Sequence, residues 1–343
     1  IVFVAGLSFL SDIKISILAQ ILSVIGITVL GFFTPTFGIM LIFVFINSLG
    51  MHLFMPMSDS IGLNLAEPDQ IGKRMGQYKG ITTAFQMLGA GLVYIGFSTG
   101  FFSFNTQIKW VFLVSALIFV VIVFVLVYLN KLLHNEGKHP RKVAFVVRKE
   151  YKFYYTLVVM YGVQKQMMMV YGPWVLIELL GKKTQDIALL AIVGLFVGIF
   201  FIPALGKWID RFGIKKLLYA DALSFILVYY LYGLLAQGYV SGALAITGFP
   251  VFLAYLIFVS DRMSSQMGII RTVYLKKIAV EPQDITPTLS LGLSLDHVMS
   301  ILFAVIGGFV WDSYGPQYIF YLVGTLSFVN LVVAIMIKED DLK

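Results

Sequence analysis

The feature that most constrains this chain is a series of apolar stretches, each long enough to cross a lipid bilayer. A helix needs about 20 apolar residues for one crossing, and Gly and Pro punctuate the joins between the stretches. The sequence therefore predicts an all-α polytopic membrane protein with about ten transmembrane helices, preceded by a short apolar stub at residues 1–10. The predicted spans lie at about 13–33, 38–58, 79–101, 108–131, 153–179, 185–205, 215–236, 245–270, 286–310 and 317–337.

Composition excludes the main alternatives to a membrane protein. Hydrophobic residues make up 59% of the chain and charged residues 13%, against about 45–50% and about 25% in soluble domains. So few charges cannot cover a water-soluble surface, which excludes a soluble enzyme. Aromatic residues make up 15%, which excludes a disordered chain. The sequence has no Cys, which removes disulfides, iron–sulfur clusters and thiol catalysis.

The distribution of Lys and Arg predicts the orientation. Most of the 25 basic residues fall on one side of the predicted spans, and seven of them belong to the segment that runs from Lys131 to Lys152, both included. Cytoplasmic loops carry such an excess, so we expect a plasma-membrane protein with this segment and the C-terminus in the cytoplasm. We interpret the net charge of +7 as loop charge, because no motif supports nucleic-acid binding.

The same polar segment divides the chain. We predict an incomplete N-terminal helical bundle at 1–131, a cytoplasmic basic linker at 132–152 and a C-terminal six-helix bundle at 153–343. The first part holds four spans and the stub, and the last part holds six. We interpret the linker as a solvated segment close to the lipid surface.

A Gly-rich, charged loop lies between two spans of the C-terminal bundle: Gly206-Lys-Trp-Ile-Asp-Arg-Phe-Gly-Ile-Lys-Lys216. Gly206 and Gly213 allow tight turns and close helix approach. Asp210 is suited to a helix N-terminus, where the dipole favours an anion. Such a contact would latch one conformation; the alternative is a basic loop that only sets topology. The cations that would stay at the anionic cytoplasmic face are Arg211, Lys215 and Lys216.

This loop resembles the signature of the major facilitator superfamily, G-x-x-x-D-R-x-G-x-K/R-K/R, at every fixed position. A degenerate copy, Ser8-Phe-Leu-Ser-Asp-Ile-Lys14, keeps Asp12. The segments 65–76 and 278–284 repeat a Glu-Pro pattern in the two parts. These two pairs of similar segments indicate that the chain has two related halves. The resemblance implies a two-bundle transporter of twelve helices, here lacking the first helix and most of the second, with a cavity lined mainly by the first, fourth, seventh and tenth helices.

Polar residues inside the spans are the candidates for a substrate cavity, because ionisable groups at membrane depth are costly. Lys165 lies near the middle of its span and would bind an anionic group; the alternatives are a salt bridge between helices or a snorkelling side chain. The Met residues that follow it suit either a broad binding site or ordinary packing. Arg271 is assigned to the cytoplasmic edge. The cavity candidates are Asn47, His52, Gln86, Gln164, Lys165, Arg262 and Gln266.

Three residues are candidates for proton coupling. Asp296 and His297 lie near the middle of one span, and His titrates near neutral pH; the alternative is a polar contact between helices. Asp261 would either carry a proton or pair with Lys165. No metal-ligand spacing, nucleotide-phosphate loop or nucleophile elbow occurs, so we expect no metal, no cofactor, no ATP-driven transport and no enzyme activity.

These patterns favour a monomeric secondary active transporter in the bilayer that moves a small molecule by alternating access. Proton coupling and export of the substrate are two more specific hypotheses. Transporters that take up sugars, peptides and carboxylates share the same fold, so the direction of transport stays open. Lys165 and Arg262 suggest an anionic substrate, whereas the aromatic and Met content suggests an amphipathic one. The alternative function is a transport-inactive sensor or assembly subunit built on a transporter-derived scaffold.

Overall fold

The structure is a computed structural model, and it describes residues 7, 10–32, 36–101, 108–133 and 146–338. Most of the predicted stub and of the predicted linker lie outside these residues. Within the described residues the secondary structure is helical, without strands. Seven helical segments of the described chain are long and apolar enough to cross a membrane. The predicted all-α polytopic architecture is therefore confirmed.

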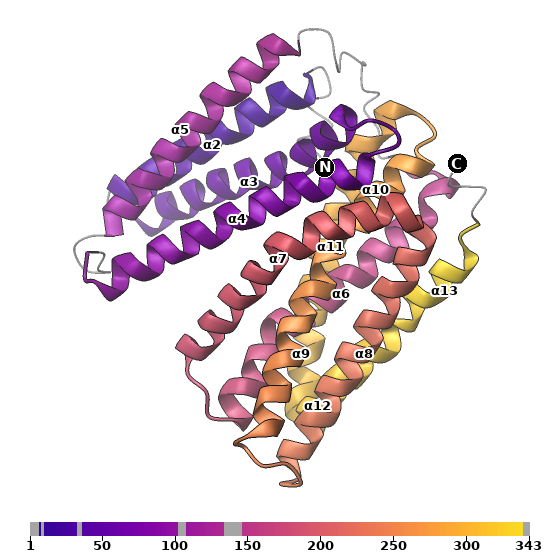
Figure 1. Cartoon of the computed structure of the whole chain (residues 1–343). Helices are drawn as coiled ribbons and strands as arrows, with labels where there is room; N and C mark the ends of the chain where they lie inside the picture. Colours follow the sequence, from indigo (N-terminus) through magenta and orange to yellow (C-terminus); the bar gives the residue numbers. More distant parts are fainter. Residues whose placement is uncertain (1–6, 8–9, 33–35, 102–107, 134–145, 339–343) are drawn as a thin grey trace. The chain divides into compact units, whose positions relative to one another are not determined.

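Ten long helical segments of the described chain correspond to the ten predicted spans (Figure 1). Two of them are interrupted, between α9 and α10 and between α12 and α13. Several helices extend past the apolar stretch into polar sequence. The backbone hydrogen bonds of a helix are made within the helix itself, so a helix can continue into polar sequence. The α-helices are α2 Asp12–Phe32, α3 Phe37–Leu65, α4 Ile71–Ser98, α5 Ile108–Leu132, α6 Lys152–Trp174, α7 Thr184–Phe212, α8 Ile214–Val240, α9 Phe249–Gln266, α10 Ile269–Ile278, α11 Ile285–Tyr314, α12 Pro316–Leu326 and α13 Phe328–Met336.

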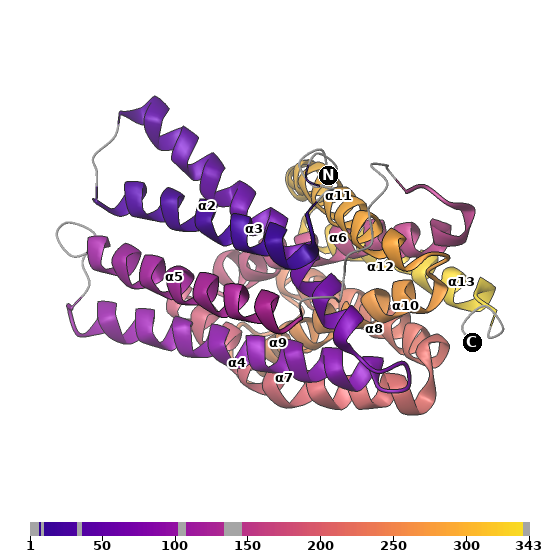
Figure 2. The ribbon, with the colours of Figure 1, turned by 90° about the horizontal axis from the view of Figure 1, so that it is seen from above.

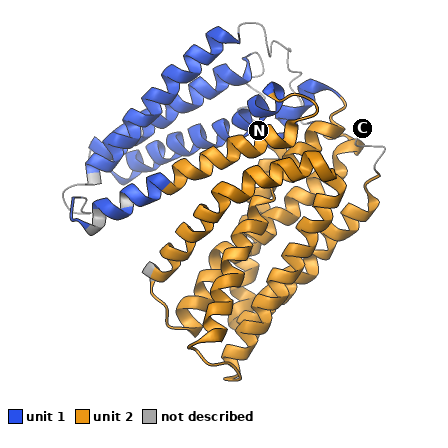
Figure 3. Cartoon of the chain, in the orientation of Figure 1, with its two compact units in different colours: residues 1–65, 88–146, 281–290 blue, residues 66–87, 147–280, 291–343 orange. Residues whose placement is uncertain are grey.

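The chain forms two compact units (Figure 3). Unit 1 comprises residues 1–65, 88–146 and 281–290, and unit 2 comprises residues 66–87, 147–280 and 291–343. The first turns of α4 thus belong to unit 2, and the first turns of α11 belong to unit 1. Each of these helix starts follows one of the two Glu-Pro segments of the sequence.

In unit 1, α2 packs against both α3 and α5, and Figures 1 and 2 both show α2 and α3 side by side. A side chain at Gly50 of α3 would collide with Ser23 of α2. Small residues allow such close packing of helices in a membrane. Ile15 and Ala19 of α2 meet Leu53 and Met57 of α3 in the buried core.

In unit 2, the core is built mainly from side chains of α6, α8, α9 and α12. Tyr229 of α8 stacks on Phe320 of α12 and donates its hydroxyl hydrogen bond to the Gln164 carbonyl of α6. Buried tyrosines need such partners for their hydroxyl groups. Met167 and Met168 are fully buried in the same core, so two residues of the Met run serve ordinary packing.

Candidate functional site

An ion pair joins α6 to α11 in unit 2. The Lys165 ammonium lies 2.5 Å from Asp296 Oδ2, with side-chain exposures of 28% and 5%. A Cβ at Gly162 of α6 would lie 3.0 Å from the Asp296 Cα, so the missing side chain permits this approach. The Ser300 hydroxyl donates a hydrogen bond to the Gly162 carbonyl, at 3.0 Å. The suggested pairing of Lys165 with Asp261 is wrong, because Asp296 occupies that place.

Two further titratable groups lie beside this ion pair. His297 Nδ1 is 4.0 Å from Asp296 Oδ2, and its side chain is 42% exposed. The Lys165 ammonium is 5.5 Å from the centre of the Tyr161 ring, in cation–π range. The structure thus brings together one predicted substrate-binding residue and two predicted proton carriers. A buried carboxylate, an ammonium and a more exposed imidazole can bind an anion and pass a proton.

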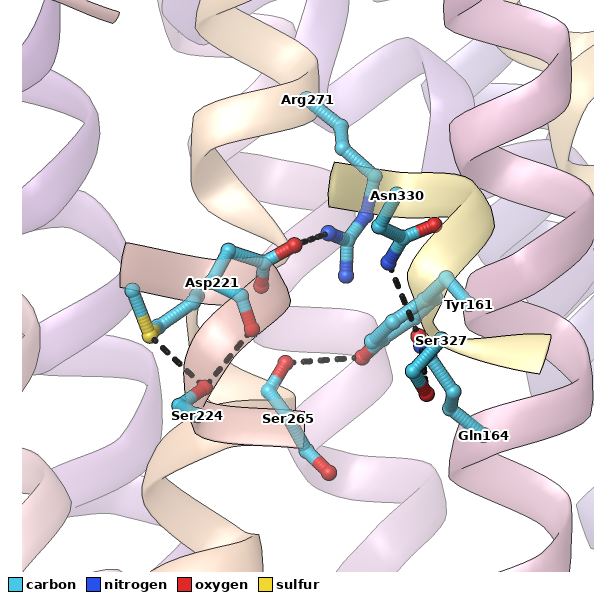
Figure 4. A network of polar contacts seen from close by, with 9 residues as sticks. Tyr161, Gln164, Asp221, Ser224, Ser265, Arg271, Ser327 and Asn330 are labelled. Carbon is cyan, nitrogen blue, oxygen red and sulfur yellow. Dashed lines mark hydrogen bonds and ion pairs between the residues drawn. The ribbon is translucent and has the colours of Figure 1, made fainter. Parts of the chain in front are cut away.

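Gln164 lies on another face of α6 and is buried in a helix contact (Figure 4). Its amide donates a hydrogen bond to Ser327 Oγ, at 2.8 Å, and accepts one from Asn330, at 3.4 Å. Ser327 is the residue at which α12 ends and α13 begins. Gln164 therefore ties α6 to this interruption in the helix.

A second ion pair, between Asp221 of α8 and Arg271 of α10, is buried in unit 2 (Figure 4). The distance between its charged atoms is 2.7 Å, and the side chains are 0% and 3% exposed. The Arg271 guanidinium lies 4.2 Å from the centre of the Tyr161 ring, and the Tyr161 hydroxyl donates to the Ser265 carbonyl, at 2.9 Å. Arg271 is thus a buried residue rather than part of an exposed edge. Two opposite charges within apolar stretches were the signal for this pair.

The polar residues of α9 point in different directions within unit 2. The stem of Arg262 lies against Gly194 of α7 and its guanidinium over Phe258, while Gln266 lies against Gly198, one turn further along α7. The absence of side chains at these two glycines, four residues apart, thus leaves space for two polar side chains of α9. Asp261 is buried, with 1% of its surface exposed, and its Oδ1 atom has no hydrogen-bond partner among the described residues.

The remaining cavity candidates lie on α3 and α4. In unit 1, Asn47 lies at the point where Gly26 lets α2 approach α3, and His52 is exposed on the same helix. In unit 2, Gln86 is exposed on α4. It lines an open hollow with the side chains of Tyr78, Ile81, Thr82 and Phe85.

The acid of the Gly-rich loop binds the N-terminus of another helix. Asp210, at the end of α7, accepts hydrogen bonds from the backbone N–H groups of Gly72 and Lys73 at the start of α4, at 2.8 and 2.6 Å. A Cβ at Gly206 would lie 2.9 Å from the Gly76 Cα, so α7 and α4 touch through glycine. Gly213 has a φ of +84° where α7 gives way to α8. Of the loop cations, Arg211 and Lys216 are exposed and Lys215 is half-buried.

The acid of the degenerate copy makes a related contact in unit 1. Asp12 accepts hydrogen bonds from Ser60 of α3, at 2.7 Å, and from Thr286 in the first turn of α11, at 3.2 Å. Each acid therefore contacts the helix start that follows a Glu-Pro segment. Sequence reasoning found the acids and the segments but did not connect them, since their separation along the chain hides the contact.

These helices and their charged interior define a multi-pass membrane protein. The family model described as the Major Facilitator Superfamily matches residues 5–275. The chain belongs to this superfamily. Among curated proteins, none matches the sequence significantly.

Several solved structures share the fold. The chain is similar to FucP, the E. coli fucose:proton symporter, in the outward conformation, with 15% identity, a TM-score of 0.70, and coverage of 96% of this chain and 84% of FucP. It is similar to XylE, a proton:xylose symporter, with 15% identity, a TM-score of 0.71 and coverage of 94% and 79%. It is also similar to the human organic anion transporter MFSD10, with 13% identity, a TM-score of 0.68 and coverage of 96% and 78%.

Proposed function

We propose that this chain is a secondary active transporter that moves a small molecule by alternating access and couples the movement to protons. The observation that carries the proposal is the ion pair between Lys165 and Asp296, with His297 beside it. Ionisable groups at membrane depth mark substrate and proton pathways. Two of the similar folds belong to proton symporters, which supports the same reading.

The proposed organisation follows the two halves of the sequence. An N-terminal bundle at 1–131 and a C-terminal bundle at 153–343 would rock against each other, joined by a cytoplasmic linker at 132–152. The protein would act as a monomer in the plasma membrane, with its C-terminus in the cytoplasm. This location rests on the excess of basic residues in the linker.

The proposed roles of the residues differ in kind. Lys165 would bind the substrate, with Arg262 and Gln266 as further polar groups of the C-terminal half. Gln164 would hold α6 in position through Ser327. Protons would be carried by Asp296 and His297, with Asp261 as the other candidate. Asn47, His52 and Gln86 are the proposed contributions of the N-terminal half.

The two acidic contacts would act as conformational latches. Asp210 holds the end of α7, from the C-terminal half, at the start of α4, from the N-terminal half. Asp12, from the N-terminal half, is held at the start of α11, from the C-terminal half. An anion at a helix N-terminus is stabilised by the dipole and by free N–H groups. Breaking both contacts would free these helix ends to separate.

The experiment that tests this function is a substrate screen in proteoliposomes that contain the full chain and a trapped pH-sensitive dye. We expect at least one of sugars, organic anions and organic cations to cross the membrane and to change the internal pH. Asp296→Asn would abolish the pH change. Loss of the pH change in Asp261→Asn instead would assign the proton to Asp261, the other candidate. Binding without flux for every compound would instead favour a transport-inactive sensor. Export and import are distinguished by the direction of the gradient that drives the flux.

A further inference from the structure

The coordination of Lys165 is incomplete. An ammonium group has three hydrogen-bond donors, and within the described residues its one ion-pair partner is Asp296, at 2.5 Å. The Tyr161 ring covers another side at 5.5 Å. The Lys165 side chain is 28% exposed, against 5% for Asp296, so Lys165 is the more accessible member of the pair. Lys165 thus has room for a second anionic group, or for an exchange of the first.

Asp296 is in the opposite situation. Its side chain is only 5% exposed, and its Oδ1 atom has no hydrogen-bond partner among the residues that the structure describes. The titratable and charged groups facing it are Lys165 and Tyr161 on α6 and His297 on its own helix. Of these groups, Lys165 is the cation that pairs with Asp296. If Lys165 turns to another anion, the negative charge of Asp296 stays buried without a nearby positive charge, which is strongly unfavourable.

From this geometry we infer that Lys165 binds the carboxylate of a small monoanionic substrate in place of Asp296, and that Asp296 takes up one proton in the same exchange. The inference rests on the proposed function and deepens it. Before the exchange the site holds Lys165 as a cation and Asp296 as an anion. Afterwards it holds the same cation, the substrate anion and a neutral Asp296, so the site stays neutral.

The charge balance selects the class of substrate. One ammonium and one proton-accepting carboxylate compensate one negative charge, whereas a phosphate dianion would leave an uncompensated charge in a low-dielectric site. A lone Lys is a compact point charge, without the fork with which Arg clamps phosphate. Asp296 itself shows that the position beside Lys165 accommodates a carboxylate.

His297 gives the proton a route. Its imidazole lies 4.0 Å from the Asp296 carboxylate and is far more exposed than that group. A proton held at His297 Nδ1 can pass to Asp296 Oδ2 once Lys165 leaves and the two groups close from 4.0 Å to hydrogen-bond distance, after which the imidazole is again neutral. Substrate and proton then move in the same direction, and one anion with one proton carries no net charge.

The first test measures binding to the purified full chain in nanodiscs, with benzoate and lactate as probes and with the neutral benzamide as the comparison. Both carboxylates stay ionised between pH 6 and 8. If binding of the carboxylate is linked to uptake of one proton, the affinity for the carboxylate rises about tenfold for each unit by which the pH falls. We expect this slope in the wild type and in Asp312→Asn, a matched control that removes an exposed carboxylate from the same helix.

Two variants separate the roles of the pair. Asp296→Asn keeps the shape of the side chain but removes its charge and proton site, so benzoate should bind without pH dependence. Lys165→Gln should lose carboxylate binding. Retention of the pH slope in Asp296→Asn, or binding that is unaffected in Lys165→Gln, overturns the inference. An ion pair that only holds α6 to α11 would give that result, with a lower unfolding temperature in both variants.

A second measurement needs no variant and stands even if the variants fail to fold. Carboxylate uptake into wild-type proteoliposomes should respond to a pH gradient and stay unchanged under a membrane potential set by potassium and valinomycin. Uptake driven by the potential overturns the inference. Proton-coupled flux of a neutral sugar without carboxylate binding also overturns it but leaves the proposed function intact. Proton-linked carboxylate binding without flux supports the inference and removes the proposed function.

Discussion

Replacing Asp210 with alanine removes two hydrogen bonds to the first turn of α4. Loss of such a cap costs about 0.5–2 kcal/mol, and loss of the charge at the helix dipole costs about 0.3–1 kcal/mol. Asp210 is exposed, so solvent screening holds the charge contribution at the low end. We expect a total of about 1–3 kcal/mol, which shifts the equilibrium between latched and released states by about 5- to 150-fold.

The chain has no Cys, so this shift can be followed with spin labels in the otherwise unaltered protein. Arg74→Cys and Lys207→Cys place labels at exposed positions on α4 and α7. Asp210→Ala should add a population with a longer distance between the labels, and Asp210→Asn should give a smaller one. Asp186→Asn, at the other end of α7, is the control. An identical distance distribution in Asp210→Ala and the wild type would refute the latch.

Three further predictions concern helix packing. Asp221→Asn leaves Arg271 buried without its partner and should lower the free energy of unfolding by about 3–5 kcal/mol; thermal unfolding in detergent checks this, and a double change to Leu and Met should recover stability. Gly162→Val should force α6 from α11, since even a Cβ there lies 3.0 Å from the Asp296 Cα, and should abolish substrate-induced proton uptake; full uptake would contradict the proposed contact. Gly206→Ala should cost about 1–3 kcal/mol by overpacking and should raise the released population in the spin-label assay, whereas an unchanged population would show that the helices tolerate the methyl group.

The architecture was predictable because each span carries its own signal. About 20 apolar residues between polar or Gly-rich joins define a membrane helix without reference to the rest of the chain. The interruptions at Gly268 and Ser327 escaped this reasoning, since hydropathy runs through both. Ser327 is held by Gln164, a residue far away in the sequence, so only the packed structure reveals its role.

The candidate site was predictable residue by residue but not as a constellation. Lys165 and Asp296 each stand out as a charge within an apolar span, yet 131 positions separate them. Their pairing depends on the absence of a side chain at Gly162, and the sequence alone suggested Asp261 as the partner of Lys165. Asp221 and Arg271 pair for a similar reason, because burial in unit 2 leaves each charge in need of the other.

The most direct test of proton-coupled transport is the number of protons that enter with each substrate molecule. Proteoliposomes that report internal pH and tracer uptake together would give this ratio for any substrate found in the screen. We predict one proton per molecule in the wild type and in Asp312→Asn, and none in Asp296→Asn, which should still exchange substrate across the membrane. An unchanged ratio in Asp296→Asn, or uptake without protons in the wild type, would contradict this prediction.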